Sequence, residues 1–320
     1  MKVPDNLVKA ILKARSFLIV IHINPDGDAL GSALALARVL KKHMGREVTL
    51  LNNDPIPQVY RFLPGWEDFS HTLPQTTPDV LILLDCGEVE RTGFKNLPGK
   101  LKLVVDHHLT KQNFGDIKWG ISDASSTGEM VFNLIHALGA PLDKDTALCL
   151  YTAIVTDTGG FRYSSTSPSS FRAAAELLEA GVSPWNVTEN IYESISSERM
   201  ALMGKALNGL KRNGEVAVIS VTDSMYKETG TSAEDTENFA NLARSIKGVE
   251  VAVFLRQIGP DSFKVSMRSK GRVNVAAIAE AMGGGGHHNA AGGLMKGRLN
   301  EVEKKVTTMV KDALGSRKPE

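Results

Sequence analysis

The chain has 320 residues and 42% of them are hydrophobic, which is enough to bury substantial cores in about two domains. Its 37 basic residues nearly balance its 36 acidic ones, so a formal net charge of +1 excludes a global positive field that would steer it onto long nucleic acid. No apolar run reaches the roughly 18 to 20 residues of a membrane span, and the N-terminus lacks the features of a signal peptide. We therefore expect a cytoplasmic protein with no membrane partner.

The chain has two cysteines, Cys86 and Cys149. Both lie in apolar segments and neither has the spacing of a metal site. A cysteine in such a segment is usually a buried free thiol, so we expect neither a disulfide nor a zinc site.

Short apolar runs alternate with helical patterns through the first half of the chain. We expect strands at 16–23, 48–53, 79–87 and 102–108, and helices at 29–44 and 126–139. Because these strands are apolar on both faces, they favour a parallel sheet covered by helices, and the loops at the carboxyl ends of such strands bind ligands. The predicted fold class is therefore α/β.

The second half of the chain predicts a smaller mixed α/β domain. A helix-rich stretch at 143–180 is followed by a polar, helical segment at 182–207 that we interpret as a connection. Strand-like segments then occur at 217–223, 249–257 and 262–269, with helical patterns at 236–246 and 273–282. We expect a first domain at 1–185, a helical linker at 186–207 and a second domain at 208–315.

Potential metal ligands follow four of the apolar runs in the first half. They are the segment from His22 to Asp28 (HINPDGD), then Asp85, then Asp106-His107-His108, and finally Asp157. One such ending has an ordinary explanation, because aspartate caps helices and Pro-Asp-Gly builds turns. Four endings at one edge of a sheet would bring together five carboxylates and three imidazoles, which is unstable unless cations lie among them.

Carboxylate and imidazole ligands together suit a first-row divalent ion, and Mn²⁺ is the first expectation, with Mg²⁺ and Co²⁺ as alternatives. Asp26 and Asp28 are one residue apart, so a tight loop can direct them to different ions, and Asp85 can bridge both. Two such ions, about 3.5 to 4 Å apart, can hold an oxyanion and activate water for attack on phosphorus. The pattern therefore predicts a two-metal phosphoesterase.

Four segments, HINPDGDALGS, LLDCG, VVDHH and TDTGGF, resemble the signature motifs of the DHH phosphoesterase family, in the same order. The tract GGGGHHNAAGG, preceded by VSMRS, resembles the DHHA1 substrate-binding domain of that family. The resemblance covers nearly the whole chain. It implies a parallel-sheet DHH domain and a smaller DHHA1 domain, with the active site in the cleft between them.

The resemblance also implies a role for each matching residue. One metal would be bound by His22, Asp26 and Asp85, and the other by Asp28, Asp85, His107 and Asp157. Asp106 would orient the neighbouring imidazole, as metal-bound histidines usually require. His108 would face the scissile phosphate and donate to a phosphoryl oxygen or to the leaving group.

Substrate binding is assigned to the second domain by the same resemblance. Arg268 matches a phosphate-binding arginine, and its planar guanidinium suits a terminal phosphate. Gly284, Gly285 and Gly286 could bring backbone N–H groups close to a phosphate, and His287 would add a side-chain donor. The alternatives are a surface arginine and a flexible glycine loop.

The compact pairing of these two domains resembles stand-alone oligoribonucleases, which degrade short RNA to mononucleotides and often dephosphorylate adenosine 3′,5′-bisphosphate. A nearly neutral chain fits short single-stranded RNA or dinucleotides such as pApA better than long polymers. Two alternatives stay open, a cyclic-dinucleotide phosphodiesterase and a nonenzymatic nucleotide-binding regulator. The second would be favoured by loss of a metal ligand, and every matching ligand is present. The family often forms homodimers, but nothing in this sequence marks an interface.

Overall fold

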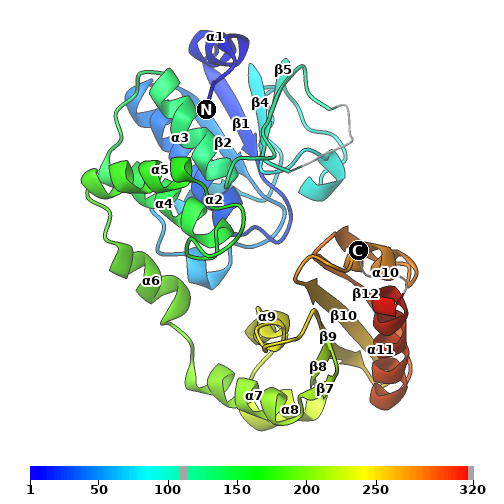
Figure 1. Cartoon of the computed structure of the whole chain (residues 1–320). Helices are drawn as coiled ribbons and strands as arrows, with labels where there is room; N and C mark the ends of the chain where they lie inside the picture. The colour runs from blue at the N-terminus through cyan, green and yellow to red at the C-terminus, as the bar shows by residue number, and fades with distance from the viewer. Residues whose placement is uncertain (109–113, 316–320) are drawn as a thin grey trace. The chain divides into compact units, whose positions relative to one another are not determined.

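The computed structural model describes residues 1–108 and 114–315 (Figure 1). The chain divides into two compact units, Met1–Ser194 and Ile195–Glu320. Each unit contains a six-stranded sheet of its own. In the described part of the chain, no helix is both long and apolar enough to cross a bilayer.

The sheet of the N-terminal unit is entirely parallel, as predicted, with the order β3-β2-β1-β4-β5-β6. Its central strands are almost wholly buried, which explains why their sequences are apolar on both faces. The strands are β1 Ser16–Val20, β2 Glu47–Leu51, β3 Phe69–Ser70, β4 Val80–Leu84, β5 Leu101–Asp106 and β6 Ile117–Gly120.

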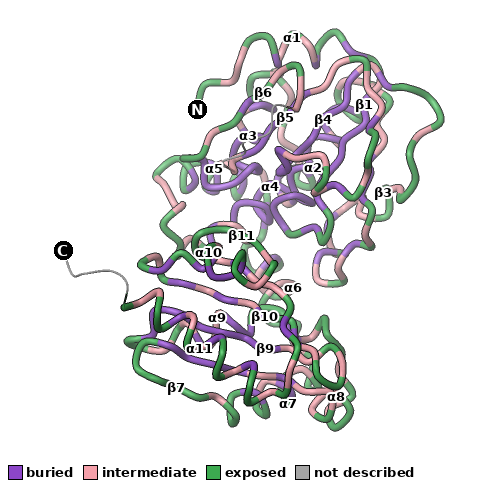
Figure 2. The backbone as a smooth tube through the Cα atoms, turned by 90° about the vertical axis from the view of Figure 1, so that its right-hand side faces the viewer, coloured by how far each residue is buried: buried purple, intermediate pink, exposed green. Residues whose placement is uncertain are grey.

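Helices of the same unit form a large apolar core with this sheet, seen as the buried segments in Figure 2. They are α1 Asp5–Lys13, α2 Gly27–Arg38, α3 Thr127–Ala137, α4 Lys144–Asp157, α5 Pro168–Glu179 and α6 Pro184–Tyr192, with short turns η1 Val39–His43, η2 Gln58–Tyr60, η3 Trp66–Asp68 and η4 Val89–Thr92. The helix expected at 29–44 begins two residues earlier and ends in the π-helical turn η1. Helices α2 and α4 pack so closely that a Cβ atom at Gly31 would lie 2.3 Å from the carbonyl oxygen of Cys149.

The C-terminal unit is a mixed α/β unit, as predicted, and its sheet has the order β11-β12-β10-β9-β8-β7. Strands β8 and β9 are parallel, and the other neighbours are antiparallel. The strands are β7 Lys211–Asn213, β8 Val216–Val221, β9 Val251–Gly259, β10 Ser262–Ser269, β11 Gly285–His287 and β12 Ala290–Lys296.

Helices pack on both faces of this second sheet and form two separate cores. One core includes Val253 and Val265 and the residues of α10 and α11, and the other includes Ile219 and Phe254 and the residues of α9. The helices are α7 Ser197–Asn208, α8 Asp223–Thr229, η5 Glu234–Thr236, α9 Phe239–Arg244, α10 Val275–Glu280 and α11 Leu299–Gly315. The segment expected to connect the domains contains most of α6 and nearly all of α7.

Candidate active site

The turn after β1 places His22 and Asp26 beside each other. Asp26 is the N-cap of α2, and its Oδ1 accepts hydrogen bonds from the backbone N–H groups of Asp28 and Ala29 over 3.1 and 3.0 Å. Its other oxygen, Oδ2, lies 3.8 Å from His22 Nε2. Asp26 therefore caps the helix with one oxygen and faces the imidazole with the other.

Asp85, the first residue after β4, lies between two groups of potential ligands. Its Oδ2 is 3.4 Å from His22 Nε2, and its Oδ1 is 3.6 Å from His107 Nε2. The side chain is buried, and the backbone has a φ of 56°, in the left-handed region that non-glycine residues rarely adopt. Backbone strain of this kind persists where the surrounding structure imposes it, and it is frequent at functional sites.

A second group of ligands comprises Asp28, His107 and Asp157. His107 Nε2 lies 3.7 Å from Asp28 Oδ2 and 3.5 Å from Asp157 Oδ2. Asp157 is the last residue of α4, so this carboxylate comes from a helix, whereas His107 directly follows strand β5. The packing of α4 against α2 places Asp157, at the end of α4, near Asp28, in the first turn of α2.

The residues present fit divalent metal ions. In each of three groups, the candidate ligand atoms lie within 4.8 Å of one another: His22, Asp26, Asp85; Asp85, His107, His108; and Asp28, His107, Asp157. His107 Nε2 is buried without a hydrogen-bond partner among the described residues, and it points at carboxylates. Burial raises the pKa of Asp28 well above its usual value, and the neighbouring carboxylates of Asp85 and Asp157 raise it further. Cations would relieve this repulsion.

His108 forms a hydrogen-bonded pair with Asp106. Its Nδ1 lies 2.8 Å from Asp106 Oδ1 and 3.3 Å from Asp85 Oδ1. Burial lowers the pKa of His108, but its hydrogen bonds with Asp106 and Asp85 outweigh burial and raise the pKa to about 10. Asp106 therefore orients the imidazole of His108, whereas His107 directs its Nδ1 to the carbonyl oxygen of Ala124 at 3.3 Å.

The start of α3 contributes residues to the site that the sequence motifs did not indicate. Thr127 N donates to Asp28 Oδ2 and Gly128 N donates to Asp28 Oδ1, both over 2.7 Å. The Thr127 hydroxyl donates to Asp85 Oδ1 over 2.9 Å. Ser126 is the N-cap of α3, and its side chain accepts a hydrogen bond from Glu129 N. The free N–H groups at a helix start favour a carboxylate, and here two adjacent amides bind the two oxygens of Asp28.

Glu129, on the same helix, is a buried carboxylate with every oxygen satisfied. Its Oε2 accepts from Ser125 N over 3.0 Å and from Ser125 Oγ over 2.6 Å, and its Oε1 accepts from Ser169 Oγ over 2.6 Å. These bonds connect the start of α3 to α5 and fix the loop before α3. Glu129 thereby supports the amide groups that bind Asp28.

The residues predicted to bind substrate all lie in the C-terminal unit. Arg268 is on β10, and its Nη1 donates to the carbonyl oxygen of Met267 over 3.0 Å. Part of the glycine tract is strand β11 rather than a loop, because it pairs with β12. A Cβ atom at Gly284 would lie 2.1 Å from the carbonyl oxygen of Gly292, so the close approach of these strands explains that glycine. His287 pairs with Ala290 at the end of β11.

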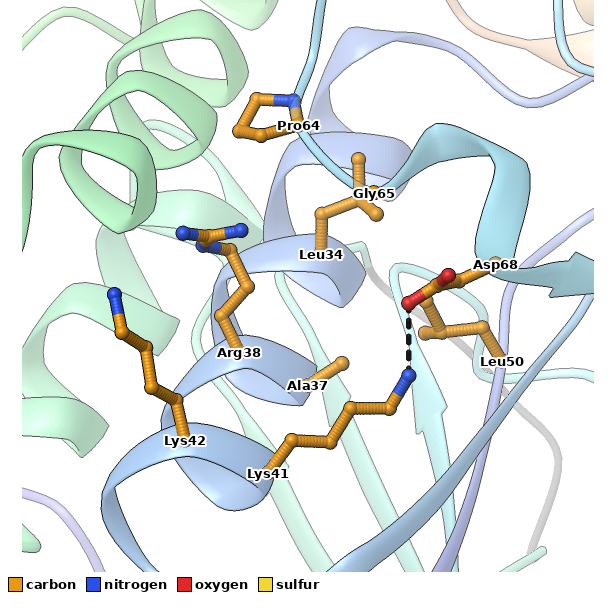
Figure 3. Close-up of a pocket in the computed structure, with 9 residues that line it drawn as sticks. All are labelled: Leu34, Ala37, Arg38, Lys41, Lys42, Leu50, Pro64, Gly65 and Asp68. Atoms are coloured by element: carbon orange, nitrogen blue, oxygen red, sulfur yellow. Dashed lines mark hydrogen bonds and ion pairs between the residues drawn. The ribbon is translucent and has the colours of Figure 1, made fainter.

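A cavity of about 210 Å³ lies at the opposite end of α2 from the ligands and is lined by Arg38, Lys41 and Lys42 (Figure 3). All three cations are already paired with carboxylates. Lys41 Nζ is 2.8 Å from Asp68, Lys42 Nζ is 2.7 Å from Asp143, and Arg38 contacts Asp143 and Asp145. We assign no chemistry to this cavity.

Comparison with known proteins agrees with this architecture. Residues 16–154 match the DHH family, N-terminal domain, and residues 213–314 match the DHHA1 domain. The chain therefore belongs to the DHH family of phosphoesterases and carries both of its domains.

Individual relatives match over most of their length. The chain is 36% identical to a protein of Thermus thermophilus named bifunctional oligoribonuclease and PAP phosphatase NrnA, over 96% of this chain and 94% of that one. It is 28% identical to the Bacillus subtilis protein of the same name, over 89% and 91%. A crystal structure of an exopolyphosphatase-related protein from Bacteroides fragilis matches with a TM-score of 0.88 at 31% identity, over 97% of this chain and 95% of that one.

Proposed function

We propose that this chain is a two-metal phosphoesterase that hydrolyses short oligoribonucleotides, and linear dinucleotides such as pApA, to mononucleotides. We further propose that it removes the 3′-phosphate of adenosine 3′,5′-bisphosphate. The names of its relatives support both activities. The observation that carries the proposal is the position of Asp85, whose two oxygens face the imidazoles of two different ligand groups.

The two ions are expected to be Mn²⁺, one bound by His22, Asp26 and Asp85 and the other by Asp28, Asp85, His107 and Asp157. When bound, they would supply Lewis-acid stabilisation of the phosphoryl oxygens and lower the pKa of water. Asp85 would contribute to both ions because its oxygens point in two directions. Asp28 would keep its orientation because two backbone N–H groups hold it.

His108 would act on the phosphoryl group or the leaving oxygen. Its Nδ1 is engaged by Asp106, which fixes the orientation of the ring. The protonated imidazole is favoured by that carboxylate, so it can donate a hydrogen bond or a proton as negative charge develops. In the C-terminal unit, Arg268, His287 and the backbone of Gly284, Gly285 and Gly286 would bind the terminal phosphate.

The test is product formation by the purified protein with Mn²⁺, offered pApA, a 5-mer RNA, a 24-mer RNA, adenosine 3′,5′-bisphosphate and cyclic di-AMP in parallel. We expect fast release of mononucleotides from the short linear substrates and slow action on the 24-mer. Preferential opening of the ring would instead indicate a cyclic-dinucleotide phosphodiesterase. No hydrolysis of any substrate would indicate a nucleotide-binding regulator.

Two variants separate the proposed roles. Asp85→Ala is expected to abolish hydrolysis of every substrate, because both ion sites lose a ligand. Arg268→Ala is expected mainly to raise KM, because it removes a phosphate contact. Substantial turnover by metal-loaded Asp85→Ala would refute the two-metal assignment.

A further inference from the structure

One face of the C-terminal sheet carries cations in two separate cross-strand rows. Alternate residues of a strand share a face, so Arg268, Ser266 and Lys264 of β10 lie on the same side. In the first row, Arg268 pairs with Ala290, which in turn pairs with His287. The first row therefore places the two residues assigned to the terminal phosphate on one face.

The other row lies four residues along β10. Lys264 pairs with Arg256 of β9 on one side and with Leu294 of β12 on the other. Four residues of a strand span about 13 Å. Between the two cationic rows, Ser266 pairs with Gly292, and no large side chain of β10 or β12 interrupts the surface there.

This face is covered near β8 and β9 and open toward β12. Ala252 and Phe254, on the same face by register, are buried in the core that includes α9, while α10 and α11 pack on the opposite face (Figure 1). Toward the other edge, Lys264 is exposed and Leu294 is 64% exposed. Lys264 and Leu294 are therefore accessible, whereas Arg256 of the same row is partly buried.

Arg256 and Lys264 are like charges placed directly opposite each other. Such a pair destabilises a sheet, because the facing Cβ atoms are only about 5 Å apart. In the part of this unit that the structure describes, the ion pairs use Lys205, Lys211 and Arg272, and no carboxylate pairs with Arg256 or Lys264. A bound anion would offset this repulsion.

We propose, on the basis of the function proposed above, that Arg256 and Lys264 bind a backbone phosphate of the oligonucleotide whose terminal phosphate lies at Arg268. The substrate then runs along β10 from the first cationic row to the other. Phosphates of one stacked strand are about 3.4 Å apart along its axis, so a span of about 13 Å needs several nucleotides. A single nucleoside bisphosphate is too short to reach both rows. This second row thus favours oligonucleotides over adenosine 3′,5′-bisphosphate.

The test compares Arg256→Ala, Lys264→Ala and the double variant with the wild type, using a 5-mer RNA and adenosine 3′,5′-bisphosphate. We expect each single variant to raise KM for the 5-mer at least about threefold, with KM for the bisphosphate unchanged. A plot of log(1/KM) for the 5-mer against log[salt] has a negative slope. Each phosphate contact that a variant loses should make this slope shallower by about 0.7. The matched control is Lys305→Ala, because Lys305 is an exposed lysine of α11 on the opposite face. This variant should leave KM for both substrates unchanged.

Binding of a fluorescent 5-mer RNA, measured by anisotropy, keeps the test independent of catalysis. Suppose that the wild type hydrolyses no RNA but binds the 5-mer, and that the double variant binds it more weakly. The proposed function is then wrong, whereas the proposal that Arg256 and Lys264 bind a backbone phosphate is supported. If the wild type and the double variant bind the 5-mer equally and have the same KM for it, the proposal that Arg256 and Lys264 bind a backbone phosphate is wrong. An equal rise in KM for the 5-mer and for the bisphosphate would also contradict the proposal, because Arg256 and Lys264 would then belong to the terminal-phosphate site. A wild type that fails to bind the 5-mer overturns both proposals.

Discussion

Thr127 donates its hydroxyl to Asp85 Oδ1 over 2.9 Å, although the two residues are 42 positions apart in the chain. Asp85 stands in a left-handed backbone conformation at the end of β4, and Thr127 is the first residue of α3. The helix therefore fixes the carboxylate that faces both ligand groups. Mutation of a partner that orients a metal ligand in this way typically weakens metal binding by about 10- to 100-fold.

Thr127→Val is expected to weaken Mn²⁺ binding about 10-fold or more, because it removes the hydroxyl that orients Asp85 while keeping the shape of the side chain. Thr127→Ser keeps the hydroxyl and should bind Mn²⁺ like the wild type. Isothermal titration calorimetry measures both affinities. Wild-type affinity in Thr127→Val would show that the hydrogen bond has no influence on the metal site.

Glu129→Gln is expected to lower the free energy of unfolding by about 1 to 3 kcal/mol, because a buried acceptor that receives three hydrogen bonds becomes partly a donor. Urea unfolding of the metal-free protein measures the change. Glu179→Gln, at an exposed position of α5, is the control and should leave the stability unchanged. A Glu129→Gln protein as stable as the control would contradict the role of this network.

The metal-free protein is expected to lose stability as the pH rises from 5 to 9. Burial raises the pKa of Asp157 from 3.8 to about 6, although His107 acts against this, and the pKa of His108 rises from 6.5 to about 10. Both values in the folded protein exceed those of the unfolded chain. The folded state therefore binds more protons over this range, and its free energy of unfolding falls as they are released.

Thermal unfolding in EDTA should accordingly give a lower Tm at pH 8.5 than at pH 6. With Mn²⁺ present the trend should reverse, because metal ligands must be deprotonated and a higher pH strengthens metal binding. The Asp106→Asn variant removes the main partner of His108 and should flatten the dependence in EDTA between pH 7 and 9. A Tm in EDTA that rises with pH would contradict the raised pKa values of Asp157 and His108.

Both cysteines are free and buried, as the sequence predicted. Burial raises the pKa of the Cys86 thiol to about 11 and that of the Cys149 thiol to about 12. Because the thiolate is the reactive form, neither should react with Ellman's reagent at pH 8 in the folded protein, and both should react in 6 M guanidinium chloride. Rapid reaction of one thiol in the native protein would show that its segment opens readily.

Much of the fold followed from local patterns in the sequence. Segments such as 79–87 are apolar on both faces, and this property indicated a parallel sheet before the strand order was known. The short strands β3, β7 and β11 were not predicted, because each has only two or three residues and takes its conformation from a neighbouring strand. The glycine tract suggested a loop, whereas Gly284 and Gly286 permit the close approach of β12, because a Cβ atom at these positions would lie 2.1 Å from Gly292 O and 2.5 Å from Ala290 O.

The sequence by itself determined which residue types follow β1, β4 and β5, and their positions after parallel strands implied that they would meet at one edge of the sheet. Only the tertiary structure decided how those side chains are held. The bonds from Thr127 and Gly128 to Asp28 join residues about 100 positions apart, and they depend on the docking of α3 rather than on any local spacing. The choice of His108 rather than His107 as the partner of Asp106 likewise depends on side-chain directions, because the two histidines are adjacent in the sequence and differ only in what surrounds them.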